Sequence, residues 1–91
     1  MENTERVRVL KDSIRRLEEQ RKYGLDIGLC NAIKWGSFKT CLITDFPEVM
    51  SQKPDKRSND AYWFFLNQEG FEKRIEILNN AIKQIEQNEK N

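Results

Sequence analysis

The sequence predicts an all-α fold: a compact bundle of about four helices whose long first and last helices run antiparallel. Apolar residues recur at helical spacing in the first and last thirds of the chain, and no strand-like alternation of comparable length occurs. A central proline also suits the start of a short helix. Ninety-one residues suffice for a single domain, 1–91, with a thin core.

We expect the first helix to begin at Asn3 or Thr4, either of which can cap it, because their side-chain oxygens accept hydrogen bonds from free backbone N–H groups. It should end at Lys22 or Tyr23, where Gly24 supplies a C-cap. The apolar stripe of this helix comprises Val7, Leu10, Ile14 and Leu17.

Short elements are expected in the middle of the chain. Leu29–Trp35 suggests a second helix, whereas 38–44 could be either strand or helix. A third helix is expected from Pro47 to about Gln52, since proline is favoured in a first turn and Pro54 disfavours helix at Lys53.

Four consecutive aromatic residues, 62–65, form a loop before the last helix. Consecutive side chains point in different directions, so two of them should enter the core and the others should lie at a rim or interface. The last helix should start at Gln68 or Gly70 and reach about Gln87, followed by a frayed tail, 88–91. Its apolar stripe comprises Phe71, Ile75, Leu78, Ile82 and Ile85.

The composition narrows the classes of function. Sixteen basic and 15 acidic residues give a net charge of +1, which argues against general binding of duplex nucleic acid. The longest uncharged stretch, 61–68, is too short to span a membrane, and residues 1–5 do not resemble a signal peptide. Cys30 and Cys41 fit a reducing cytoplasm, although a disulfide between them stays open.

Nothing in the sequence indicates catalysis. The chain has no histidine, which removes the usual general base and the commonest metal ligand. No serine or cysteine has an evident partner base. We therefore expect neither an enzyme nor a metalloprotein, and no cofactor.

Two arginines stand on apolar faces. Arg21 follows Leu17 by four residues, and Arg74 lies roughly 40° from Leu78 around the last helix. Antiparallel helices would bring both to one end of the bundle. They could clamp an anion beside the positive end of the last helix. Alternatively, Arg21 extends into water and Arg74 forms a salt bridge with Asp26, Asp45 or Glu48.

Further residues would complete an anion site. Aromatic side chains are available to stack on a nucleotide base, and a basic segment could close over it. The candidate ligand-binding residues are Arg21, Arg74, Tyr23, Tyr62, Trp63, Lys53, Lys56 and Arg57. An ordinary solvated loop is the alternative for the three basic residues from Lys53 to Arg57.

A homo-oligomer, most simply a dimer, is also expected. Ile77 and Ala81 widen the apolar face of the last helix beyond what one neighbouring helix covers. Core packing within the monomer is the alternative, more so for Ala81 than for Ile77.

The order of several short motifs resembles that of small phage- and prophage-encoded proteins. These motifs are Gly28–Ile33, Phe46–Glu48, Lys53–Pro54 and Tyr62–Phe64, followed by Arg74, Leu78 and Ile82. The resemblance covers about 28–85, carries over no catalytic residue and leaves Arg21 outside. It implies an accessory protein in the cytoplasm of a host cell, of a class similar to proteins that counter bacterial immunity.

Two functions therefore compete. In the first, the protein sequesters a small, phosphate-bearing, nucleotide-derived signal between Arg21 and Arg74. In the second, it is an adaptor or inhibitor whose exposed aromatic residues dock on a host protein. Carboxylate partners for both arginines within the chain would remove the basis of the first function.

Overall fold

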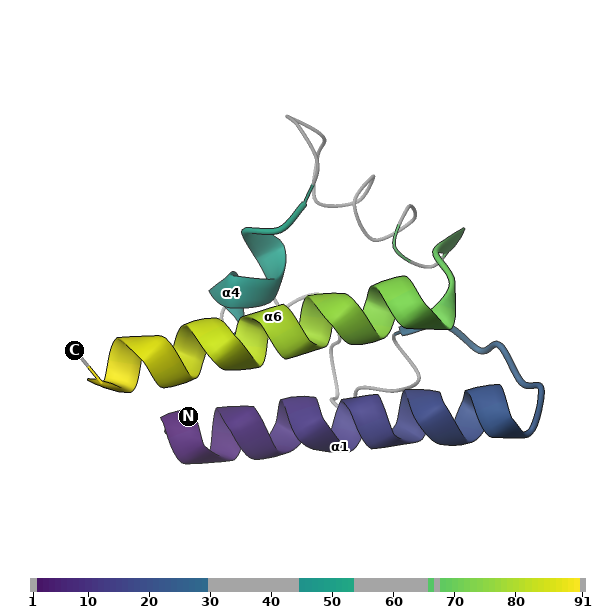
Figure 1. Cartoon of the computed structure of the whole chain (residues 1–91), viewed down its shortest axis with the longest axis horizontal. Helices are drawn as coiled ribbons and strands as arrows, with labels where there is room; N and C mark the ends of the chain where they lie inside the picture. Colours follow the sequence, from purple (N-terminus) through teal and green to yellow (C-terminus); the bar gives the residue numbers. More distant parts are fainter. Residues whose placement is uncertain (1, 30–44, 54–65, 67, 91) are drawn as a thin grey trace.

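The computed structural model describes residues 2–29, 45–53, 66 and 68–90. In this part of the chain, α1 (Asn3–Lys22) and α6 (Phe71–Lys90) are long helices that run antiparallel and side by side (Figure 1). The short helix α4 (Pro47–Met50) packs against α6. These ranges contain no strand, which confirms the all-α class. The expected helix Leu29–Trp35, the segment 38–44 and the aromatic loop 62–65 lie largely outside the described residues.

Helix α1 has the expected bounds but not the expected N-cap. Glu2 occupies the cap position, and its side chain makes no capping hydrogen bond. Asn3 is already helical, so its side chain lies in the first turn, where its Oδ1 accepts a 2.8 Å hydrogen bond from Nη1 of Arg6. The prediction that Asn3 or Thr4 caps this helix is therefore wrong.

Gly24 ends α1 as predicted. Its φ of 72° lies in the left-handed region that glycine adopts readily. The N–H of Leu25 donates to the carbonyl of Gln20 at 2.7 Å, and the N–H of Gly24 donates to that of Arg21 at 3.1 Å. These two bonds make a Schellman motif, which fixes the direction in which the chain leaves the helix.

The core lies between α1, α4 and α6. On α1, the buried positions are Leu10, Ser13, Leu17 and Gln20, while Val7 and Ile14 are only partly buried. Compared with the predicted stripe, the helix is therefore rotated so that the side with Ser13 and Gln20 faces the core. The Ser13 hydroxyl is satisfied by a 2.9 Å hydrogen bond to the carbonyl of Val9. The buried apolar residues are Leu10, Leu17, Leu29, Phe46, Val49, Leu66, Ile77, Leu78, Ala81, Ile82 and Ile85.

Arg6 connects the start of α1 to α4. Its Nε donates to the main-chain oxygen of Asp45 at 2.8 Å, and its Nη2 pairs with Oε1 of Glu48. Its guanidinium also lies 5.7 Å from the ring centre of buried Phe46. Pro47 occupies the first turn of α4 as predicted, and the helix ends at Met50, before the expected Gln52.

Helix α6 buries the face that was expected to support a dimer. Ile77 is 5% exposed and Ala81 is fully buried, and α4 packs against this helix. Gln52 donates a 2.8 Å hydrogen bond to the main-chain oxygen of Ile77. The inference that Ile77 lies on an intermolecular surface is therefore wrong. At its C-terminal end, α6 continues to Lys90, through most of the expected tail.

Candidate functional site

The site begins where α1 ends and α6 starts, at one end of the helical pair (Figure 1). Arg21 in the last turn of α1 contacts Glu72 in the first turn of α6. Arg74 stands one turn into α6. Antiparallel pairing thus brings both arginines to the same end of the molecule, as the sequence predicted, but their environments differ.

Arg74 is fully buried. Its Nη2 donates a 2.8 Å hydrogen bond to Oδ1 of Asp26, and its Cζ lies 4.8 Å from the ring centre of Phe71. The other two guanidinium nitrogens, Nε and Nη1, are buried without a hydrogen-bond partner. One of the three carboxylates expected to pair with Arg74 therefore does so, through a single oxygen.

Asp26 is anchored at one side and open to water at the other. The hydrogen bond from Arg74 is the largest cause that holds the pKa of Asp26 below its usual value of 3.8, and the Gly28 N–H contributes. The Asp26 side chain is nevertheless 60% exposed. It thus lies between a buried cation and solvent.

Arg21 is not in the core. Its side chain is 55% exposed and pairs at 3.3 Å with Glu72, which is 84% exposed. Arg21 therefore extends into water, which was one of the two alternatives, because the rotation of α1 gives the inner position to Gln20 instead. Gln20 is 8% exposed, and its Oε1 has no hydrogen-bond partner.

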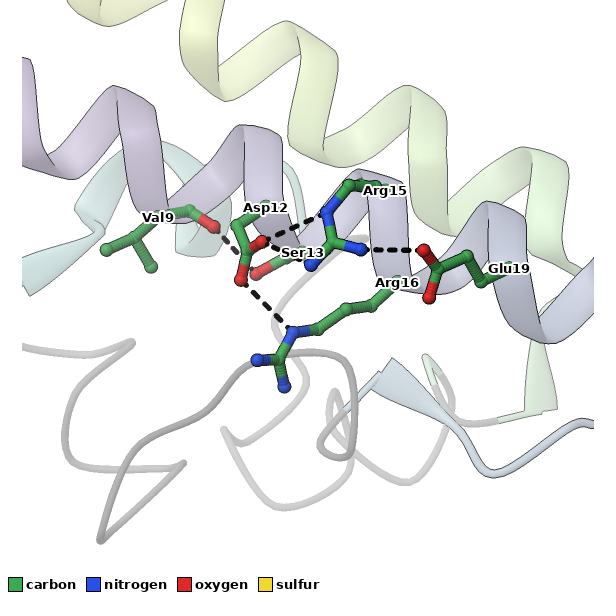
Figure 2. A network of polar contacts seen from close by, with 6 residues as sticks. All are labelled: Val9, Asp12, Ser13, Arg15, Arg16 and Glu19. Atoms are coloured by element: carbon green, nitrogen blue, oxygen red, sulfur yellow. Dashed lines mark hydrogen bonds and ion pairs between the residues drawn. The ribbon is translucent and has the colours of Figure 1, made fainter.

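Charged residues along α1 neutralise one another. Asp12 accepts hydrogen bonds from Arg15 at 2.7 Å and Arg16 at 3.1 Å, and Arg15 also pairs with Glu19 at 2.6 Å (Figure 2). The bond from Arg15 is the largest cause that lowers the pKa of Asp12. These arginines are therefore not a free basic surface for a polyanion.

The other predicted residues fall in different places. Tyr23 is 70% exposed at the end of α1. Lys53 is half-buried just after α4. Tyr62, Trp63, Lys56 and Arg57 lie outside the described residues, so the expected stacking surface and basic lid stay predictions.

Exposed apolar residues gather just after α1. Among the described residues, the large apolar side chains that are exposed are Tyr23 at 70%, Leu25 at 53% and Ile27 at 51%. We call these three residues the 23–27 face. The exposure of Leu25 and Ile27 was not predictable from the sequence, because two isolated apolar residues in a turn-like segment are equally compatible with burial.

Two hollows border this region. A shallow groove of about 680 Å³ between α1 and α6 has three acidic and three basic side chains among its lining residues. A smaller hollow of about 370 Å³ is lined by Gln20, Tyr23 and Leu25 together with paired Arg15, Arg16 and Glu19. The larger groove is balanced in charge, whereas the smaller one adjoins the 23–27 face.

Metal and membrane sites find no support in the described ranges. No group of three or more histidine, cysteine, aspartate or glutamate side chains there could hold a metal ion. None of the helices described is both long and apolar enough to cross a bilayer.

No protein-family model, curated protein or solved structure matches this chain. The resemblance to phage-encoded proteins therefore rests on the short motifs alone.

Proposed function

We propose that this is a non-enzymatic adaptor or inhibitor that docks on another protein of the cell through the 23–27 face. The observation that carries the proposal is the exposure of Tyr23, Leu25 and Ile27, each more than half accessible. In a chain with so few apolar residues, three exposed together indicate a contact surface rather than chance.

The 23–27 face is held in place before a partner arrives. The Schellman motif at Gly24 fixes its start, and the bond from Asp26 to Arg74 fixes its middle. Asp26 pairs with buried Arg74, whereas the side chains of Leu25 and Ile27 on either side of it are exposed. A preorganised segment loses less conformational entropy on binding, which favours affinity.

The surroundings define the chemistry of the partner. Arg21 and Lys22 are exposed beside the face, and the Lys22 ammonium lies 5.7 Å from the Tyr23 ring centre. An apolar patch rimmed by carboxylates complements this arrangement. A second copy of the chain fits less well, because a symmetric contact would place the same cations opposite one another.

The Gln20 side chain supplies a specificity contact for the partner. It lines the small hollow beside Tyr23 and Leu25, and its Oε1 lacks a donor. After a rotation of the amide, an N–H or O–H group of the partner could satisfy this oxygen. A buried acceptor without a partner is destabilising, so its pairing in a complex would favour binding.

The competing function, a phosphate clamp made by Arg21 and Arg74 together, has less support. Both guanidinium groups have carboxylate partners within the chain, Glu72 and Asp26 respectively. The expected dimer loses one of its supports, because Ile77 is buried, whereas the aromatic residues 62–65 lie outside the described residues.

The test is site-specific cross-linking in an extract of the cells that contain the protein. A photoreactive residue at Tyr23 should capture one dominant protein that the same residue at exposed Lys83 does not capture. The purified pair is then measured by calorimetry. Leu25→Ser combined with Ile27→Ser should weaken binding at least about tenfold, given the burial expected for two anchors.

Controls separate docking from folding and from self-association. The double variant should keep the helicity and melting temperature of the parent, since both side chains are exposed. Lys83→Ser should leave affinity unchanged. Equal capture at both positions, or equal affinity of the double variant, would refute the proposal, as would a captured species that is only a second copy of this chain.

A further inference from the structure

Arg74 has more hydrogen-bonding capacity than its surroundings use. A guanidinium carries five N–H donors, and this one is fully buried. Among the described residues, Nη2 has one acceptor, Oδ1 of Asp26 at 2.8 Å, while Nε and Nη1 have none. Buried donors without partners are costly, so an anion with several oxygens would be bound more favourably here than a single carboxylate oxygen.

The position of Arg74 strengthens this preference for an anion. Side chains on a helix lean toward its N-terminus, and the 4.8 Å contact with Phe71 places the Arg74 guanidinium over the first turn of α6. The N-terminal end of a 20-residue helix carries a partial positive charge. Two positive features thus meet at one point, and Asp26 is the carboxylate bonded there.

Asp26 can leave this point more easily than a core residue could. Its side chain is 60% exposed, and it lies between Gly24 and Gly28, both of which have positive φ. Its other described hydrogen bond comes from the Gly28 N–H within the same short segment. Movement of Asp26 would therefore release Nη2 of Arg74 without a change in α1 or α6.

We propose that Arg74 and the first turn of α6 form a phosphate site, which the chain's own Asp26 fills in the free protein. A phosphate group, free or in an ester, displaces the Asp26 carboxylate and accepts hydrogen bonds from Nε and Nη2, the side of a guanidinium suited to bidentate contact. Its remaining oxygens face the N-terminal turn of α6. Arg21 is not required.

This site can be tested separately from the docking proposed above, although loss of the bond between Asp26 and Arg74 would also release the middle of the 23–27 face. It uses the inward side chain of the 23–27 segment, whereas docking uses the outward ones. The Leu25→Ser and Ile27→Ser double variant should therefore bind phosphate like the parent. Failure of one proposal leaves the other unaffected.

The experiment is an NMR titration of the whole protein with inorganic phosphate at constant ionic strength, with chloride as the reference anion. The Arg74 Nε–H signal and the amides of 26–28 should shift together and saturate. The Asp26 carboxyl carbon should shift as well, because its bond to Arg74 is lost. If phosphate caused only the shifts that chloride also causes, without saturation, the result would mean an adventitious ion only and would overturn the proposal.

Two variants make the test specific. Asp26→Asn removes the competing charge and should tighten phosphate binding about tenfold or more, because displacement no longer opposes it. Asp12→Asn is the matched control: it removes a carboxylate paired with Arg15 and Arg16 on α1, outside the first turn of α6, and should leave phosphate affinity unchanged. Equal phosphate affinity of Asp26→Asn and the parent would overturn the proposal. This outcome can be measured without an Arg74 variant such as Arg74→Met, which could fail to fold.

A second arm identifies the source of the phosphate group. Adenosine monophosphate is titrated beside inorganic phosphate, with adenosine as the control. Tighter binding of the nucleotide assigns the site to a phosphate ester, and equal binding assigns it to free phosphate. Displacement of Asp26 by either supports the proposal, whereas shifts caused equally by adenosine would refute it.

Discussion

Gln52 donates a 2.8 Å hydrogen bond to the main-chain oxygen of Ile77, and its own Oε1 accepts one of 3.2 Å from Asn80. This amide bridge attaches the end of α4 to the middle of α6. It holds the residue that follows α4 against the side of α6 that carries Ile77.

The first prediction concerns Ile77. Replacement by lysine should lower the free energy of unfolding by about 3 kcal/mol, because it removes a buried apolar side chain and introduces a charge. Urea unfolding followed by circular dichroism measures this loss. Asn79→Lys, at an exposed neighbouring position, should change stability by less than about 0.5 kcal/mol. A stable Ile77→Lys protein that changes only its oligomeric state would restore the intermolecular interpretation.

The second prediction concerns the contact between α1 and α4. Arg6→Met should cost about 2–3 kcal/mol, because Glu48, only 13% exposed, loses its cation and the Asp45 carbonyl loses a donor. Arg8→Met is the comparison, since Arg8 is 71% exposed and its pair with Glu5 should contribute less than about 0.5 kcal/mol. Similar losses in both variants would show that Arg6 has no special role.

The third prediction concerns Gly24. Gly24→Ala should lower stability by about 1 kcal/mol, because the φ of 72° is unfavourable for a residue with a Cβ although no atom lies within 4 Å of the added methyl. Gly70→Ala meets equally open space without a positive φ and should be tolerated. Thermal unfolding of the two variants separates backbone strain from steric contact.

The fourth prediction concerns acid stability. The folded-state pKa of Asp26 is lowered below 3.8, so its stabilising contribution is complete well above that pH. It should disappear as the pH falls from about 3.8 through the lower folded-state pKa. In phosphate-free buffer, the stability difference between the parent and Asp26→Asn should therefore narrow over this interval. A stability difference between the two proteins that stays constant from pH 7 to pH 2 would contradict this prediction.

The long helices could be predicted because each apolar stripe extends over several turns and Gly24 marks an end. The rotation of α1 could not. Around the helix, Arg21 lies about 40° from Leu17 on one side and Gln20 about 60° on the other, so the stripe itself favours Arg21. Packing against segments distant in the sequence buries Gln20 instead, and the local pattern of apolar residues carries no information about those segments.

The candidate site was predictable only in part. Arg74 lay inside an apolar arc, and Asp26 was one of its three expected partners. The pair between Arg6 and Glu48 joins residues 42 positions apart, and 16 basic and 15 acidic residues allow too many such pairs to choose among them. The exposure of Leu25 and Ile27 depends on which distant segments pack against them, and the local sequence does not predict this packing.

The polar contacts between separate elements span long stretches of chain: Arg21 meets Glu72 across 51 positions, and Arg74 meets Asp26 across 48. Helical proteins usually fold fast because their contacts are local. Here α1 and α6 can stabilise each other only after a long loop has closed, and loop closure carries an entropic cost before any packing is gained. The folding rate of this small protein should therefore resemble that of mixed α/β domains more than that of simple helical bundles. Shortening the connection between its two long helices should speed folding more than strengthening either helix.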